Sequence, residues 1–158
     1  MSLLFILFPL IGLILINLPL QILYKKLYFA IGVGITLLQM TMALTTRLPL
    51  WTDLGNLIKD HVPVKLGMTD YSPLVLLTIG LVSFVSLIVC VSTEKKELLN
   101  FTSLTLIITM GMNGLVLVTD LFSLYVFLEI VAVSSFILIA IYKEKSALLG
   151  SFRYFVMS

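Results

Sequence analysis

Long apolar stretches, separated by short polar connections, occupy most of the chain. Uncharged runs of about 18 or more residues are long enough to cross a bilayer as helices. Such runs occur at 3–23, 27–44, 73–92, 98–119 and 121–142. The pattern predicts an all-α integral membrane protein with about five transmembrane helices.

A sixth apolar segment, at 146–158, is shorter than the other five. As a helix it would extend only about 20 Å, less than the roughly 30 Å hydrocarbon core of a bilayer. We expect an interfacial helix, a helix completed by another chain, or the remnant of a longer ancestral protein. We assign residues 1–158 to a single membrane domain.

The composition agrees with a lipid environment. Hydrophobic residues make up 60% of the chain and charged residues only 11%, whereas a soluble domain has about 25% charged residues. The net charge of +2 is too small to indicate nucleic-acid binding. No Lys or Arg precedes the first apolar run and no clear cleavage site follows it, which favours a retained helix over a signal peptide.

Basic residues are distributed unevenly among the connections. Two lysines follow each of the first, third and fifth predicted helices: Lys25 and Lys26, Lys95 and Lys96, and Lys143 and Lys145. The loop at 45–72 carries both signs of charge: Arg47, Lys59, Lys65, Asp53, Asp60 and Asp70. The positive-inside rule therefore predicts a multi-pass protein of the cell (inner/cytoplasmic) membrane with its N-terminus outside.

The loop at 45–72 is the only sizeable polar stretch. Weak alternation in PVKLGM, residues 63–68, suits a short strand. Trp51 and Tyr71 suit anchors at the membrane interface. At the end of the loop, Ser72-Pro73 predicts an N-terminal cap and a first-turn proline for the third helix.

One acid, Glu129, lies inside the fifth apolar run, and no other charged residue occurs between Asp120 and Lys143. Asp120 suits the N-cap of this helix, which places Glu129 roughly 13 Å deeper, near mid-bilayer. An ionised carboxylate there costs several kcal/mol or more unless it is paired or hydrated. Either desolvation keeps the acid protonated or a nearby cation keeps it charged. Both make its protonation state depend on a neighbour, as a proton relay requires.

The partner of Glu129 is not evident in the chain. Helical spacing places it on one stripe with apolar or aromatic residues: Phe122, Tyr125, Ala132, Val133 and Phe136. Arg153 is the one basic residue in an apolar segment that could approach, and Tyr125 is a second possible contributor to an ion relay. We therefore expect a Lys, His or Arg on a neighbouring subunit, or water. The alternative is a protonated acid hydrogen-bonded within a packed helix pair.

The remaining polar and small residues of the apolar runs suit packing. Asn17, Gln39 and Asn113 can hydrogen-bond between helices, although they could instead line a hydrated path. The glycines of GVG at 32–34 and GMNG at 111–114 favour close helix approach over ligand binding. Buried side chains in the helices are thus predicted to be mainly structural.

Nothing in the sequence predicts catalysis by this chain. Cys90, the single cysteine, is predicted to be a small buried hydrophobe, and His61, the single histidine, a solvated loop residue. We find no nucleophile–base pair, nucleotide fingerprint or metal-ligand spacing. We predict no catalytic residues, no cofactor and no metal, so any enzymatic role is uncertain and would come through a larger oxidoreductase complex.

The run TDLFSLYVFLEIVAVSSFILIAIY at 119–142, followed by SALLGSFRYFVMS, resembles a known family. It is similar to the antiporter-like membrane subunits shared by Mrp-type sodium/proton antiporters, respiratory complex I and membrane-bound hydrogenases. Their fifth helix carries an acid in a pattern of the form D-L-F-x-L-Y-V-F-x-E. The helix order, the outside N-terminus and the segment GMTDYSPLVLL before the third helix are also similar.

The resemblance covers the whole chain but only the N-terminal portion of the family architecture, which contains two inverted five-helix repeats. It gives Glu129 the role of the fifth-helix glutamate, whose partner in that family is a lysine on the seventh helix. No residue here takes the lysine role. At a sixth-helix position where many relatives have Lys, this chain has Arg153. The resemblance thus implies other membrane subunits, one with an intramembrane Lys.

Two main hypotheses follow. In the first, the chain belongs to a multi-subunit complex that translocates protons or sodium, and Glu129 is a midplane protonatable site. In the second, it is an accessory structural or assembly subunit without its own ion path. A small independent carrier is a third, weaker hypothesis. The sequence does not distinguish protons from sodium, the redox from the antiporter type of complex, or an active from a purely structural chain.

Overall fold

The computed structural model describes residues 2–17, 25–45, 66–93, 98–141 and 145–157. Within these ranges the chain is all-α, as predicted, and its regular secondary structure consists of six helices. They are α1 (Ser2–Asn17), α2 (Lys25–Leu44), α4 (Ser72–Thr93), α5 (Leu98–Leu117), α6 (Leu121–Ile139) and α7 (Lys145–Met157).

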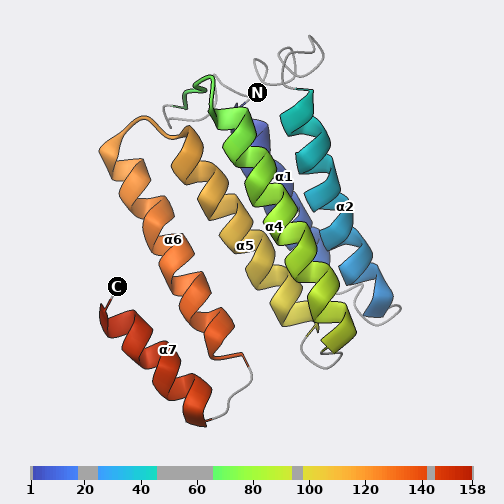
Figure 1. Cartoon of the computed structure of the whole chain (residues 1–158), viewed down its shortest axis with the longest axis vertical. Coiled ribbons are helices and arrows are strands. Elements are labelled where there is room, and N and C mark those ends of the chain that lie inside the picture. The colour runs from blue at the N-terminus through green and yellow to red at the C-terminus, as the bar shows by residue number, and fades with distance from the viewer. Residues whose placement is uncertain (1, 18–24, 46–65, 94–97, 142–144, 158) are drawn as a thin grey trace.

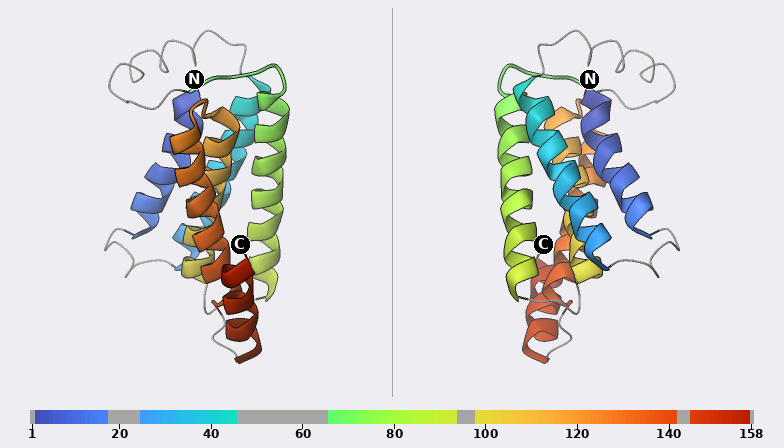
Figure 2. Two further views of the ribbon diagram at one scale, coloured as in Figure 1. Left: turned by 90° about the vertical axis from the view of Figure 1, so that its left-hand side faces the viewer. Right: turned by 90° about the vertical axis from the view of Figure 1, so that its right-hand side faces the viewer.

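The helices form a bundle with an appendage. Helices α1, α2, α4 and α5 pack against one another, and α5 contacts all three of the others. Helix α6 packs on α5, and α7 packs on α6 (Figure 1). The side views in Figure 2 show α7 beside only the lower part of α6 and extending beyond the lower end of that helix. Helix α6, which carries Glu129, therefore lies at the edge of the bundle.

Three of the described helices are long and apolar enough to cross a membrane: Ser72–Val91, Leu98–Leu117 and Leu121–Ile139. Two further apolar helices, Ser2–Asn17 and Phe29–Leu44, are shorter. The predicted first run extends to residue 23, but residues 18–24 lie outside the described ranges. The short sixth segment forms α7, a helix of 13 residues.

Side-chain hydrogen bonds lie at the start of two helices. Asp120 precedes α6 in an extended conformation and accepts a hydrogen bond from the Ser123 backbone N–H at 2.8 Å, which confirms the predicted N-cap. Helix α4 begins at Ser72 with Pro73 in its first turn, as predicted. The predicted cap role of Ser72 is not seen, because its hydroxyl accepts from the Thr69 N–H, which precedes the helix, at 3.0 Å.

The segment before α4 contacts the end of α5. Leu66 forms an isolated antiparallel bridge with Val118, and the Gly67 N–H donates to the Leu117 carbonyl at 2.7 Å. The short strand was predicted at residues 63–68, of which 63–65 lie outside the described residues. In the described remainder, Leu66 forms this isolated bridge. The bridge ties the polar loop to the same end of the bundle at which α6 begins.

The interior of the bundle is mostly aliphatic but contains a polar centre. One core cluster joins Phe5, Met42, Leu76 and Leu117, and a second joins Ile16 and Leu106. Gln39 and Asn113, both buried, hydrogen-bond to each other across α2 and α5. Their structural role is as predicted, because each buried amide is fully engaged in contacts between helices.

Glycines allow two close helix approaches. A Cβ added at Gly32 of α2 would lie 2.6 Å from Thr102 of α5. One added at Gly111 of α5 would lie 2.6 Å from Val131 of α6. Carbon atoms pack at about 3.5–4.0 Å, so neither site has room for a side chain. Gly34, by contrast, faces open space, so the packing prediction for GVG holds at Gly32 only.

Candidate functional site

Glu129 lies near the middle of α6, nine residues after the cap Asp120. At helical rise this is roughly 13 Å along the helix axis. Its side chain is exposed in the chain as described. An exposed carboxylate at this height of an apolar helix is the feature that most needs a physical explanation.

The contacts of α6 explain why Glu129 points outward. Phe127, Ile130 and Val131 are the α6 residues nearest to the two glycines of α5, and Ser134 is the one fully buried residue of the helix. At 100° per residue these positions form a single inner stripe, and Glu129 falls on the opposite side of the helix. The α5 contact therefore turns Glu129 away from the bundle.

Glu129 borders a hollow of about 230 Å³ between α6 and α7. Four α6 residues and two α7 residues line it: Leu128, Glu129, Ala132, Val133, Tyr154 and Phe155. Next to the hollow, the rings of Phe136 and Phe155 pack with their centroids 5.3 Å apart and their planes tilted by 46°. Helix α7 thus covers the outer stripe of α6 up to the level of Glu129 and leaves the acid at its rim.

Of the two predicted contributors, only Tyr125 lies beside Glu129. Tyr125 lies one turn earlier on α6, and its hydroxyl is close enough to interact electrostatically with the Glu129 carboxylate. Arg153 is exposed on α7 and does not line the hollow. In the part of the chain that the structure describes, no basic residue lines the hollow beside Glu129.

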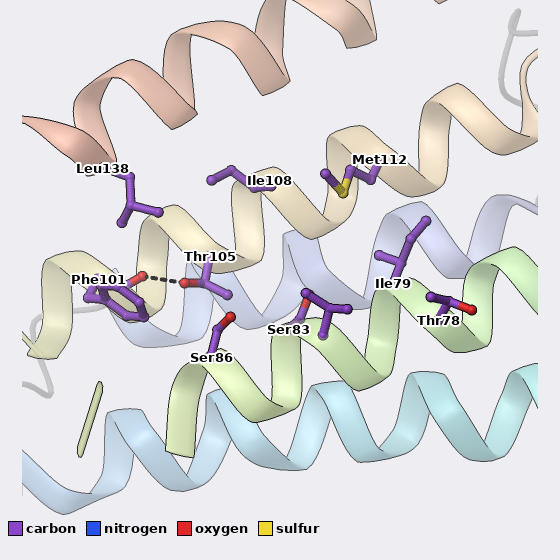
Figure 3. A pocket seen from close by; sticks show the side chains of 10 residues that line it. Thr78, Ile79, Ser83, Ser86, Phe101, Thr105, Ile108, Met112 and Leu138 are labelled. Carbon is purple, nitrogen blue, oxygen red and sulfur yellow. Dashed lines mark hydrogen bonds between the residues drawn. The ribbon is translucent and has the colours of Figure 1, made fainter. Parts of the chain in front are cut away.

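A second hollow, of about 340 Å³, lies on the opposite side of α6, between α4, α5 and α6 (Figure 3). Its wall is mainly apolar, but Thr78, Ser83, Ser86 and Thr105 add hydroxyl groups. Ser83 also forms a 2.7 Å hydrogen bond with Thr109 of α5. Sequence reasoning missed this hydroxyl-lined region, although Thr102, Thr105 and Thr109 recur at helical spacing.

A third hollow, of about 360 Å³, lies where α1 ends and α5 begins. Asn17, Asn100 and Ser103 provide its polar wall, and Ile137, Ala140 and Ile141 contribute to its apolar one. Asn17 donates to the Leu13 carbonyl at 2.9 Å and to the Ser103 hydroxyl at 3.5 Å. This confirms a structural contact for Asn17 between α1 and α5.

The described residues contain no group of three or more His, Cys, Asp or Glu side chains that could hold a metal ion. Cys90 is buried, as predicted. His61, like Trp51, lies outside the described residues. Within the six described helices, Glu129 is the one Asp or Glu side chain.

No family model and no curated protein matches the sequence. Among solved structures, the chain is similar to a chain of the membrane-bound sulfane sulfur reductase, an archaeal respiratory membrane complex. The TM-score is 0.75 and the sequence identity 25%, and the match covers 98% of this chain. It covers 33% of the other chain, so this chain spans about a third of the length of that subunit.

Proposed function

We propose that the chain is a membrane subunit of a multi-subunit respiratory-type complex and that Glu129 is a protonatable site on its route for protons or sodium ions. The arrangement would be that of an antiporter-like module in an assembly related to complex I or of the Mrp type. The observation that carries the proposal is an acid at mid-height of a membrane helix, on a face that the bundle does not cover.

Physical chemistry supports a functional reading of that acid. A charged side chain at the bilayer centre is costly, and intramembrane acids are therefore generally found where they face a partner or a hydrated cavity. Glu129 borders a hollow, and the Tyr125 hydroxyl lies within interaction range of its carboxylate. A hydroxyl one turn away can donate to the ionised carboxylate and lower the cost of the charged state. It can also accept a hydrogen bond from the O–H of the protonated acid, so it can stabilise both states.

The similarity to a chain of the archaeal respiratory complex supports the same proposal from the fold. It covers nearly all of this chain and supports a place in a multi-subunit respiratory membrane complex. Since the matched chain is about three times as long, the helices that complete the site would come from further polypeptide. We propose that these helices bring an intramembrane lysine to the outer face of α6.

The decisive variant is Glu129→Gln, which keeps the shape and hydrogen-bonding capacity of the side chain but cannot exchange a proton. The complex is purified from its native membrane through a tag on this chain and reconstituted into vesicles. Ion movement is followed with pH- and sodium-sensitive dyes. We expect ion movement to fall to background in Glu129→Gln while the subunits still copurify. Asp120→Asn, which changes an acid at the end of the same helix, serves as the control and retains transport.

A structural role is the alternative, and the tight α5–α6 contact at Gly111 and Gly114 favours it as a second candidate. In that case the chain fills space between larger subunits and has no ion path of its own. Glu129→Gln would then transport normally, whereas bulky residues at the two glycines would prevent the subunits from copurifying. Purified chain that transports ions alone would instead support the independent carrier.

A further inference from the structure

The direction of Glu129 depends on how α6 is rotated about its own axis, and the contact with two glycines of α5 limits that rotation. Gly111 and Gly114 of α5 form a notch against which Phe127 of α6 lies. A Cβ added at Gly114 would lie 2.5 Å from both Cγ and Cε1 of the Phe127 ring. A Cβ added at Gly111 would lie 3.5 Å from the Phe127 carbonyl oxygen. Both the ring and the backbone of Phe127 therefore abut glycine backbone.

The other inward contacts of α6, from Val131 at Gly111 and from the buried Ser134, lie on the same stripe as Phe127. The helix is apolar around its circumference, so hydrophobicity does not select one inward face. Apart from Ser134, none of its residues is fully buried. The aromatic contact with α7, through Phe136 and Phe155, holds α7 to α6 but does not orient α6 against the bundle.

We propose that the Gly111–Gly114 notch and the Phe127 ring position Glu129 for its relay role, by setting the rotation of α6 on α5. Phe127 and Glu129 are two residues, or about 200°, apart on the helix. A ring seated in the notch thus directs the carboxyl outward to the hollow beside Tyr154. Phe127 is a positioning residue in this account, because it does not itself contact the carboxylate. The inference rests on the proposed function.

The experiment measures the position of residue 129 directly. In a Cys90→Ala background, spin labels at Gly34→Cys and Glu129→Cys report the distance between α2 and α6 within the purified complex. Gly34 suits a label because an added side chain there meets open space. Since carbon atoms pack at about 3.5–4.0 Å, the ring must retreat by roughly 1 Å from a new methyl group. We expect Gly114→Ala to shift the mean distance by about 1 Å or more, and Gly114→Val to shift it further.

Two variants distinguish positioning from general damage. Gly150→Ala adds the same methyl group to α7 in open space and leaves the distance unchanged. Phe127→Leu removes the ring, so combining it with Gly114→Ala returns the distance toward the original value. If Gly114→Ala fails to assemble, Phe127→Leu alone is measured. It empties the notch without a clash and broadens the distance distribution.

A second measurement links the rotation of α6 to the protonation of Glu129. With Glu129 intact, Gly114→Ala shifts the pH profile of ion movement, and the added Phe127→Leu reverses the shift. An unchanged distance and an unchanged pH profile in folded Gly114→Ala complexes would overturn the inference. Suppose that Gly114→Ala shifts the distance but that the separate Glu129→Gln variant still transports ions. The positioning role of Phe127 would then stand, and the proposed relay function of Glu129 would be lost.

Discussion

The side-chain amides of Gln39 on α2 and Asn113 on α5 hydrogen-bond to each other in both directions. Gln39 Nε2 donates to Asn113 Oδ1 at 3.0 Å, and Asn113 Nδ2 donates to Gln39 Oε1 at 3.1 Å. Asn113 also donates to the Phe5 carbonyl of α1 at 2.8 Å, and Gln39 to the Leu76 carbonyl of α4 at 3.2 Å. Two side chains thereby connect all four helices of the bundle.

Asn113→Ala is expected to lower the free energy of unfolding by about 1–3 kcal/mol, because it leaves the buried Gln39 amide without its partner. The measurement is thermal or denaturant unfolding of the purified chain in detergent. Replacing both amides, as in Gln39→Leu with Asn113→Leu, costs less than the sum of the single changes because no polar group is then orphaned. Asn17→Ala, at an exposed amide, is the control. Equal losses at Asn17 and Asn113 would contradict the account.

Asp120→Ala is expected to destabilise α6 by about 0.5–2 kcal/mol, because the Ser123 N–H loses its 2.8 Å acceptor. Amide hydrogen exchange over residues 121–125 should accelerate in this variant. Asp120→Asn keeps a side-chain acceptor and should restore most of the protection. Equal protection in Asp120→Ala and in the unchanged chain would show that the cap does not hold the first turn.

Gly32→Ala and Gly34→Ala test the glycine packing with identical changes two residues apart on α2. At Gly32 the new methyl group meets Thr102 at 2.6 Å, whereas at Gly34 nothing lies within 4 Å. We expect Gly32→Ala to lower the melting temperature. Gly34→Ala should leave it unchanged or raise it, because alanine favours helix by up to about 1 kcal/mol. Equal changes in the melting temperature of the two variants, in either direction, would contradict the close approach of α2 and α5 at Gly32.

Run length and local chemistry were enough to predict the elements of the fold. The uncharged run at 98–119 became α5, ending at Leu117, and the acid at 120 became the cap of α6. These predictions succeed because bilayer thickness sets helix length and because unpaired N–H groups at a helix start need an acceptor. Neither depends on knowing which helices are neighbours.

The lateral arrangement could not be predicted in the same way. Helices that are apolar on every side carry no signal for which face turns inward, so the meeting of Gln39 and Asn113 follows only from the packed structure. The residues around Glu129 were predicted in part, since Tyr125, Ala132 and Val133 share its stripe. Tyr154 and Phe155 joined them only through the packing of α7 on α6. Arg153 lies on α7 but outside the hollow.

The central claim is that the carboxyl of Glu129 changes its protonation state as an ion moves through the assembled complex. Infrared difference spectroscopy of the complex in vesicles, recorded while a pH or sodium gradient is imposed, measures this directly. The account predicts a carboxyl C=O stretching band that rises or falls with the gradient, is absent in Glu129→Gln and persists in Asp120→Asn. A carboxyl spectrum that does not respond to either gradient, or the same band in Glu129→Gln, would contradict it.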